Sequence, residues 1–202
     1  CIRDRYDITV TGMEMHAGPT PMAIRRDALF AASFLVQAVI NIANAHQPQG
    51  RGTVGEIHAH PGSRNVIPGQ VRFTADLRHE DEATLTRMDQ EWRRVCDDIA
   101  VAHGVQVDLK DVQTFRPTPF DPDLVDKVRQ GAASRGLPAM NIVTGAGHDA
   151  VYMAAVAPTA MIFVPCKDGV SHNEIEDAQP EHLEAGCNVL LDAMVARANA
   201  AR

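Results

Sequence analysis

The sequence predicts an α/β protein of two parts, and two observations support this. Segments of strand and helix periodicity follow one another as β-α-β-β-α-β up to about residue 113, which is the split pattern of a ferredoxin-like fold. The stretch "TFRPTPFDPD", residues 114–123, then places three prolines within ten residues, which is typical of a linker. Further α/β segments follow the linker. We therefore divide the chain into residues 5–113 and residues 114–202.

The six elements of the first part follow from hydrophobic periodicity. Alternating polar and apolar side chains predict strands, and apolar side chains every three or four positions predict helices with one buried face. The predicted elements are a strand at 5–14, a helix at 23–45, strands at 52–61 and 71–78, a helix at 85–102 and a strand at 105–112. The turn-rich stretch "PGSRNVIPG" joins the two middle strands, and Gly104 is well placed to end the second helix.

The second part is predicted to be an incomplete layer. Its predicted elements are a helix at 122–135, a strand near 140–143, a glycine turn at 144–150, a buried strand at 159–166 and a last helix from about 180. Two strands with these helices leave one side of a sheet open, so this part needs a partner that the chain does not supply. The chain also begins with Cys1, and its first methionine is Met13. We therefore expect a C-terminal piece of a longer protein.

The composition argues against several classes of function. The chain has 202 residues, 45% of them hydrophobic, and a net charge of −7 without a basic block, so we expect no nucleic-acid partner. No apolar run approaches the roughly 18 residues that span a bilayer, so we expect no membrane partner. The four cysteines are scattered without a CxxC pair, which favours a reducing cytoplasm. GxSxG, GxGxxG and P-loop motifs are absent from the sequence.

His172, in the loop "GVSHNEIE", is the first candidate for chemistry. The loop follows a predicted buried strand, and ligand sites of α/β sheets lie at the carboxyl ends of strands. Ser171, Asn173 and Glu176 could orient the imidazole or cap the next helix. As one corner of a metal site, His172 needs further ligands. The alternative is a solvated or hydrogen-bonded loop histidine.

Two other histidines stand in glycine-marked turns. In "TGAGHDA", Gly145 and Gly147 allow close approach of the backbone to a ligand at His148, and Asp149 could hold the ring or cap a helix. The alternative is a plain helix-cap turn. In "MHAGPTPM", His16 lies between a strand and a helix, where a helix N-terminus favours an anionic group. The alternative is an ordinary turn histidine.

Asn65 and Arg78 form a further candidate pair, thirteen residues apart on or beside adjacent strands. An arginine fork with an amide suits a small carboxylate substrate. The alternative is a surface arginine paired with Asp76 or a glutamate, and a turn asparagine. We interpret the histidines of "HAHPG" as structural.

Taken in order, these motifs resemble one family. The strings "HAGPTPMAIRRDA", "GTVGEI", "PGSRNVIPG", "ADLRH", "TGAGHDA" and "PTAMIFVPCKDGVSHNEIE" are similar to the amidase, hydantoinase/carbamoylase branch of dinuclear metallopeptidase-like hydrolases. That branch includes N-carbamoyl-L-amino acid hydrolases, allantoate amidohydrolases and β-ureidopropionases. The resemblance runs across nearly the whole chain. One departure is Thr144, where serine is more usual.

The resemblance implies a fold and an assembly. A full-length member is about twice this length, with a ferredoxin-like lid and dimerisation domain inserted into its catalytic domain. Residues 5–113 would be that lid, and residues 114–202 the C-terminal segment of the catalytic domain. We expect a homodimer formed through the lid.

The resemblance also implies roles for the candidate residues. Two divalent metals (Zn, Mn, Co or Ni) would be held mainly by the N-terminal half, with His172 as the last ligand. His16 would stabilise an oxyanion in the neighbouring subunit, Asn65 and Arg78 would bind the substrate carboxylate there, and Gly147 and His148 would contact substrate. Other ligands and the general-base glutamate would lie outside this chain.

The predicted activity is metal-dependent hydrolysis of a linear, non-peptide C–N bond in an N-carbamoyl-L-amino acid or allantoate. We expect the isolated chain to be inactive, to carry no tightly bound metal, and to leave His172 exposed. Two alternatives stay open. One is a ferredoxin-like interaction module without catalysis, and the other is a peptidase or aminoacylase of the same superfamily.

Overall fold

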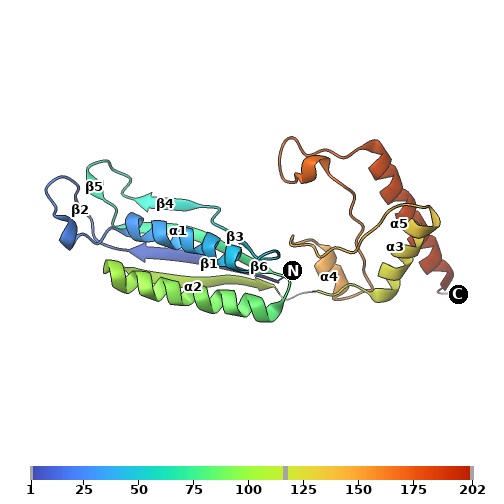
Figure 1. Cartoon of the computed structure of the whole chain (residues 1–202), viewed down its shortest axis with the longest axis horizontal. Helices are drawn as coiled ribbons and strands as arrows, with labels where there is room; N and C mark the ends of the chain where they lie inside the picture. Colours follow the sequence, from blue (N-terminus) through green and yellow to red (C-terminus); the bar gives the residue numbers. More distant parts are fainter. Residues whose placement is uncertain (1, 116–117, 201–202) are drawn as a thin grey trace. The chain divides into compact units, whose positions relative to one another are not determined.

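The computed structural model describes residues 2–115 and 118–200, which form two compact units (Figure 1). Unit 1 comprises Cys1–Pro117 with Val143–Gly145, and unit 2 comprises Thr118–Ile142 with Ala146–Arg202. The stretch predicted as a linker includes residues 116 and 117, which lie outside the described residues, as does Cys1. Each unit is described by itself.

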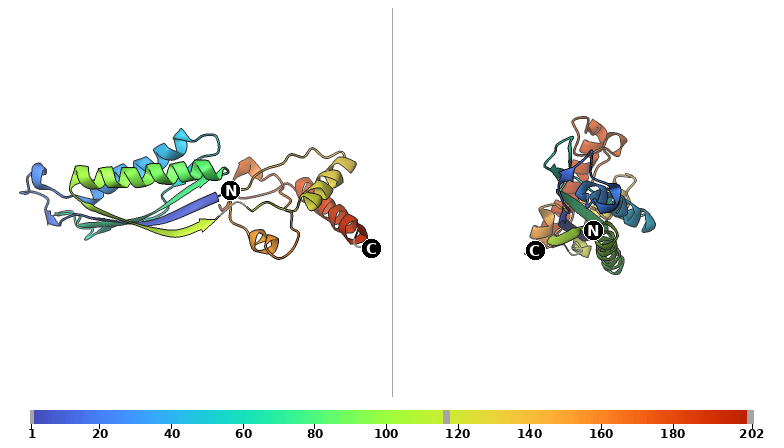
Figure 2. Two further views of the ribbon diagram at one scale, coloured as in Figure 1. Left: turned by 90° about the horizontal axis from the view of Figure 1, so that it is seen from below. Right: turned by 90° about the vertical axis from the view of Figure 1, so that its left-hand side faces the viewer.

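Unit 1 is built on an antiparallel sheet with two helices on one face (Figures 1 and 2). The strands are β1 (Ile2–Thr11), β3 (Arg51–Thr53), β4 (Ile57–His60), β6 (Gln70–His79) and β7 (Gln106–Phe115). They lie in the order β3-β6-β1-β7, and β4 also pairs with β6. The strand predicted at 52–61 is therefore interrupted, because residues 54–56 between β3 and β4 leave the ladder.

The sheet has a buried face and an open face. Along β6 the side chains of Val71, Phe73, Ala75, Leu77 and His79 are buried, and those between them are not. Because successive side chains of a strand point to opposite faces, Asp76 and Arg78 lie together on the face away from the helices. The open face is therefore the polar surface on which unit 1 can present side chains to a ligand.

Helix α1 (Ala28–Ala45) begins later than predicted. Asp27 is its N-cap, since the carboxylate accepts hydrogen bonds from the backbone N–H groups of Leu29 and Phe30, and a 3₁₀ turn, η1 (Met22–Ile24), precedes it. With 18 residues and a mean hydropathy of 1.7, α1 is long and apolar enough to cross a membrane by length and composition. The prediction that no apolar run approaches this length is thus wrong. One side of the helix is buried in the core of unit 1, which is where a core helix needs its apolar residues.

Helix α2 (Glu82–His103) confirms the predicted spacing. Leu85 and Met88 are buried, and Val95 and Ile99 pack against the same core. Gly104 ends the helix in the left-handed conformation, with φ of 61°. This is a conformation that glycine adopts without steric cost.

A second sheet in unit 1 was not predicted. It pairs β2 (Met15–His16) with β5 (Val66–Ile67), two residues in each strand. We call this pair with its adjoining loops, residues 12–21 and 61–69, the tip of unit 1. The tip precedes β6 in the chain and lies at the end of unit 1 opposite the N-terminus (Figure 1).

Unit 2 consists of helices and irregular segments in the part that the structure describes. The helices are α3 (Pro122–Ser134), α4 (Ala150–Ala154), the 3₁₀ turn η2 (Lys167–Gly169) and α5 (Pro180–Ala200). The strands predicted near 140–143 and at 159–166 are wrong, since neither segment is a strand. Their apolar composition favours a strand, but a strand forms only where a neighbour supplies the ladder hydrogen bonds, and the described residues of unit 2 supply none.

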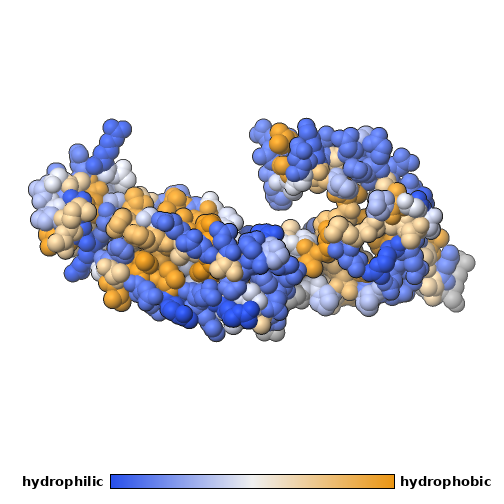
Figure 3. Space-filling view, in the orientation of Figure 1, coloured by the Kyte–Doolittle hydropathy of each residue, from blue (hydrophilic) through white to orange (hydrophobic). Residues whose placement is uncertain are grey.

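Unit 2 has a small core and exposes many apolar side chains, and Figure 3 shows apolar patches among hydrophilic ones on its visible face. Helices α3 and α5 pack through Gly131, Ala132, Val189 and Ala193, and Arg135 binds Asp192 through two nitrogens at 2.5 and 2.9 Å. A groove of about 670 Å³ runs between these helices and the segment 160–164. Its walls are apolar and include Leu124, Val128, Ile162, Val164, Leu183 and Leu190.

Candidate functional site

His16 is held at the tip, and one of its ring nitrogens has no hydrogen-bond partner among the described residues. Strand β2 places it opposite Val66, and its Nδ1 accepts a hydrogen bond from the backbone N–H of Gly18 at 3.1 Å. An Nδ1 that accepts a backbone hydrogen bond assigns the proton of the neutral ring to Nε2. His16 is exposed, so Nε2–H is available as a donor to a ligand.

Asn65 lies beside His16. The backbone carbonyl oxygen of Asn65 accepts a hydrogen bond from the backbone N–H of Ala17 at 2.8 Å, which ties the two loops together. Its backbone N–H donates to the hydroxyl of Ser63 at 3.3 Å, and its side-chain amide has no hydrogen-bond partner among the described residues. The structure therefore brings His16 and Asn65 together, each with a free polar group.

Arg78 lies far from both of them within one chain. Strand β6 runs from Gln70, next to the tip, to Arg78 near its other end. At about 3.3 Å per residue this separation is roughly 26 Å. A molecule of amino-acid size does not span that distance, so one chain does not offer Asn65 and Arg78 to the same carboxylate.

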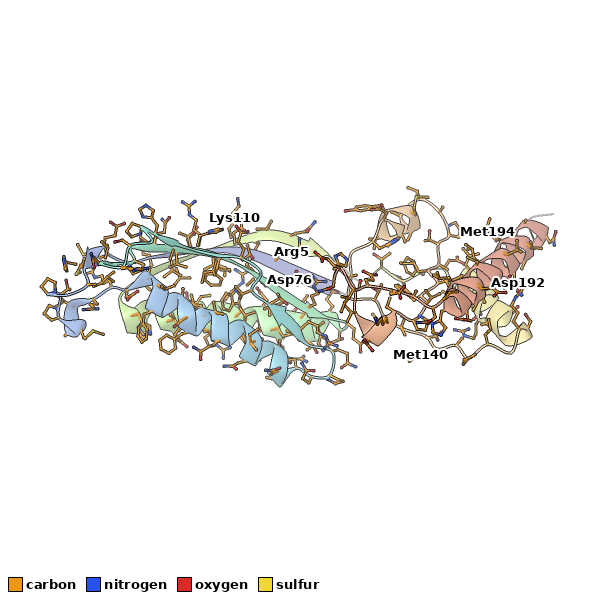
Figure 4. All side chains as sticks on the ribbon, turned by 90° about the horizontal axis from the view of Figure 1, so that it is seen from above. Arg5, Asp76, Lys110, Met140, Asp192 and Met194 are labelled. Atoms are coloured by element: carbon orange, nitrogen blue, oxygen red, sulfur yellow. The ribbon has the colours of Figure 1, made fainter. Side chains whose placement is uncertain are left out.

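The guanidinium of Arg78 is fixed by a network on the open face. Its Nε and Nη2 donate to the two carboxylate oxygens of Asp76 at 2.5 and 2.9 Å. Its Nη1 donates to the carbonyl oxygen of Gly145, which also belongs to unit 1, at 2.7 Å. Arg5 adds a third donor to Asp76, from Nε at 3.0 Å, and Arg5 and Asp76 point toward each other in Figure 4.

These contacts set the charge of Asp76. Burial pushes the pKa of Asp76 upward, but the hydrogen bonds and positive charges of Arg78 and Arg5 outweigh it, so the pKa lies below that of an ordinary aspartate. Asp76 is therefore a carboxylate at neutral pH. Arg78 therefore does form the ion pair with Asp76 that the sequence offers as the alternative to a substrate anchor. This pair does not use up the guanidinium, because three of its five N–H donors are bonded and two have no partner among the described residues.

His148 and Gly147 lie in the exposed turn before α4. The Nδ1 of His148 accepts a hydrogen bond from the backbone N–H of Ala150 at 3.0 Å, so the histidine itself caps the first turn. Asp149 stands at the N-cap position of α4, as one of the two predicted alternatives has it, but its side chain makes no cap hydrogen bond. The bond at Nδ1 again leaves Nε2 as the outward nitrogen of His148.

His172 is exposed, as expected, and stands in the left-handed conformation with φ of 59°. Its backbone N–H donates to the carboxylate of Glu176 at 2.8 Å, and the side chain of Asn173 accepts from the backbone N–H of Ile175 at 3.1 Å. These two side chains therefore shape the loop and do not hold the ring.

The residues present do not fit a metal centre by themselves. Among residues 2–115 and 118–200 there is no group of three His, Cys, Asp or Glu side chains that could hold a metal ion. A catalytic metal takes at least three protein ligands. His172 thus offers at most one donor of such a set.

Arg5 is the residue of the site that sequence reasoning missed. Asp76 and Arg78 share a face because they stand two apart in a strand, which the sequence pattern does reveal. Arg5 reaches Asp76 because β1 and β6 pair in a register that places the two residues opposite each other. That register joins residues 71 positions apart. No local signal in the sequence indicates it.

Comparison with known proteins assigns the chain to a family. The profile of the peptidase family M20/M25/M40 matches residues 11–196, and the chain belongs to this family. The resemblance of the motifs to the hydantoinase/carbamoylase branch is confirmed by the named relatives described next.

Two of these relatives are curated amidohydrolases. The chain is 42% identical over 193 residues to an N-carbamoyl-L-amino-acid amidohydrolase of Rhizobium meliloti, with 94% of the chain and 45% of that protein covered. It is 33% identical over 190 residues to an allantoate amidohydrolase of Bacillus subtilis, with 94% of the chain and 46% of that protein covered.

A solved structure gives the same result. An amidase of the hydantoinase/carbamoylase family from Burkholderia multivorans superposes with a TM-score of 0.88 at 53% identity, over 97% of the chain and 48% of that protein. The chain thus spans about half the length of the relatives it matches.

Proposed function

We propose that this chain is part of a metal-dependent amidohydrolase that cleaves a linear, non-peptide C–N bond in an N-carbamoyl-L-amino acid or in allantoate. The relatives named for these two activities support the reaction class. The observation that carries the choice of substrate is Arg78, whose fixed guanidinium keeps two N–H donors free on an open polar face. Both proposed substrates carry a carboxylate, and a planar pair of N–H donors matches a carboxylate.

We infer that residues 5–113 form a ferredoxin-like lid and dimerisation domain, and that residues 114–202 belong to a catalytic domain. An antiparallel sheet in the order β3-β6-β1-β7 with two helices on one face supports the first assignment. The small core and apolar groove of unit 2 support the second, because such a surface is what a larger domain covers with its remaining layers.

His172 is proposed as one ligand of a site for two divalent metals, drawn from Zn, Mn, Co and Ni. Its exposed ring, free of protein hydrogen bonds among the described residues, is compatible with that role. The remaining ligands and the general base would come from residues outside these 202. This chain's own contributions would be the carboxylate anchor at Arg78 and the donors at His16 and Asn65.

We further propose that one catalytic site draws on two copies of the chain. His16 and Asn65 lie in the tip next to Gln70, and Gln70 is roughly 26 Å along β6 from Arg78, so a single copy cannot place all three on one small substrate. We assign His16 and Asn65 to one copy and Arg78 to the other. This assignment replaces the expectation that Asn65 and Arg78 reach the substrate from the same neighbouring copy.

A substrate panel on the protein expressed from its complete reading frame tests the reaction. We expect release of ammonia from an N-carbamoyl-L-amino acid or from allantoate, with about two divalent metals bound per chain, as in paired-metal hydrolases. Turnover of dipeptides or N-acyl amino acids in place of both would assign a peptidase or aminoacylase. A metal-free protein without any turnover would favour an interaction module.

Mixed dimers of His16→Ala and Arg78→Ala subunits test the shared site. If the two residues come from different copies, one site of the mixed dimer has both residues intact and the other has neither, so activity returns toward half of the wild-type value. If both come from the same copy, each site carries one lesion and activity stays low. Tagged subunits purified in tandem ensure that only mixed dimers are assayed.

A further inference from the structure

One end of the open sheet face concentrates arginines around a single aspartate. Arg5 lies directly opposite Asp76 in the pairing of β1 with β6, and Arg51 lies opposite Arg78 in the pairing of β3 with β6. Arg51 directs its guanidinium to the backbone carbonyls of Pro48 and Gly50, at 2.6 and 2.9 Å. The carboxylate of Asp76 therefore lies between the other two guanidiniums, those of Arg5 and Arg78.

The contacts of Asp76 determine which edge of Arg78 is free. Asp76 occupies Nε and one hydrogen of Nη2, which together form one side of the planar guanidinium. The carbonyl of Gly145 occupies one hydrogen of Nη1. The two donors left are one on each terminal nitrogen. Because two hydrogen bonds to Asp76 hold one side of the guanidinium, the group cannot turn without breaking them.

We propose that Asp76, itself fixed by Arg5, is a positioning residue that sets the orientation of Arg78 for carboxylate recognition. This inference rests on the proposed function, in which Arg78 anchors the substrate carboxylate. In this proposal Asp76 does not contact the substrate and acts by holding the guanidinium of Arg78 in one orientation. Together the three groups carry a net charge of +1, which matches a substrate with one carboxylate.

A positioning role and a purely electrostatic role of Asp76 predict changes of opposite sign in KM when Asp76 is replaced. Asp76 is negative, so if it acted only through its charge, its removal would make the site more positive and would tighten carboxylate binding. If it positions Arg78, its removal frees the fork, and binding weakens despite the more positive charge. The sign of the change in KM therefore separates the two.

The test is Asp76→Asn in the full-length enzyme, assayed with N-carbamoyl-L-alanine or allantoate, whichever is turned over faster. We expect KM to rise by roughly tenfold, by analogy with the lower end of the loss that removal of an outer-shell partner causes at metal sites. We expect kcat to change by less than about twofold, since the anchor acts equally on bound substrate and transition state. Asp76→Glu keeps the charge and should recover part of the loss.

A matched control lies on the same face. Asp108 on β7 is exposed, has no hydrogen-bond partner among the described residues, and lies opposite Thr9 of β1. Asp108→Asn removes the same charge and should leave KM unchanged. Thermal unfolding of each variant separates a local change at Arg78 from a loss of fold. The KM for the substrate divided by the KM for its carboxamide should rise for Asp76→Asn alone.

Each outcome has one meaning. A KM for Asp76→Asn that is unchanged or lower overturns the positioning role. An equal rise in KM for Asp108→Asn also overturns it, because the effect would then be general electrostatics. Arg78→Ala, assayed in parallel, separates the two proposals. If Arg78→Ala raises KM and Asp76→Asn does not, only the positioning role fails. If Arg78→Ala leaves KM unchanged, the carboxylate anchor itself is wrong.

Discussion

At the scale of single residues, substitution of Arg78 distinguishes a substrate anchor from a structural ion pair. In the full-length enzyme, Arg78→Ala should lower kcat/KM by roughly 30- to 1000-fold, which corresponds to about 2–4 kcal/mol. The free energy of unfolding should fall by about 1 kcal/mol or less, since partly exposed ion pairs contribute little and Arg5 still binds Asp76. Steady-state kinetics and urea unfolding measure the two effects.

Arg72→Ala is the matched control for this substitution. Arg72 stands on the same strand and the same open face, is exposed, and has no hydrogen-bond or ion-pair partner among the described side chains. It should leave both kcat/KM and the free energy of unfolding near wild type. Equal losses for the two variants would show that the face acts through its charge and that Arg78 is no anchor.

His16 tests the donor at the tip. Its Nδ1 is occupied by Gly18, so the ring presents Nε2–H, which suits stabilisation of an oxyanion. His16→Ala should lower kcat by about 100- to 1000-fold, the cost of one lost oxyanion donor. The metal content measured by elemental analysis should stay unchanged. Loss of metal in this variant would make His16 a ligand instead, and His58→Ala, another exposed histidine of unit 1, should change neither quantity.

At the scale of elements, the buried face of α2 should dominate the stability of unit 1. Met88 is fully buried and Val101, on the same helix, is 85% exposed. Met88→Ala should lower the free energy of unfolding by about 2–5 kcal/mol, because it removes buried contacts and leaves a cavity. Val101→Ala should change it by about 0.5 kcal/mol or less. Denaturant unfolding followed by the fluorescence of Trp92 compares the two variants, and similar losses would mean that α2 packs by another face.

Periodicity predicted the parts of the fold whose partners lie nearby in the chain. The spacing from Leu85 to Ile99 fixes the buried face of α2, because a helix forms its hydrogen bonds within itself. The strand predicted at 159–166 depends on a partner strand, so the same apolar composition did not suffice there. Strands β2 and β5 have two residues each, which is too short for any period to be recognised.

The candidate site was predictable to the same extent. The motifs picked out His16, Asn65 and Arg78, but they did not indicate which of them lie together. The pairing of β2 with β5 joins His16 to Asn65, while the length of β6 separates Asn65 from Arg78. Both facts depend on strand register, which the side chains of one strand alone do not determine.

At the scale of the whole molecule, the two units should differ in resistance to proteolysis. Unit 1 has a core shared by the sheet and two helices, whereas unit 2 buries few side chains and exposes Met140, Val156 and Met194. A segment with few buried contacts opens readily. Limited trypsin digestion of the 202-residue chain should cut unit 2 at least about tenfold faster, as mass spectrometry of the fragments would reveal. Equal protection of both units would contradict this.

The 202-residue chain should also bind zinc weakly. Metal affinity arises from several deprotonated ligands held together, and the described residues offer no such group. Equilibrium dialysis should give less than one tightly bound zinc per chain, and His172→Ala should not change that value. Two tightly bound metals per isolated chain would refute the proposal that the other ligands lie elsewhere.

Because β6 is long, a small rotation of unit 1 about its Arg78 end moves the tip by a large distance. A rotation of about 5° about the Arg78 end displaces the tip by roughly 2 Å, because the arm is roughly 26 Å long. A binding geometry has to be held within about 0.5 Å, which over this arm is a rotation of about 1°. The stiffness of the sheet alone therefore does not fix the positions of His16 and Asn65 within this tolerance. If two copies share a site as proposed, the surface that receives the tip must hold it in place. Substitutions at exposed tip residues such as Met13 should then lower kcat/KM as much as substitutions near Arg78 do.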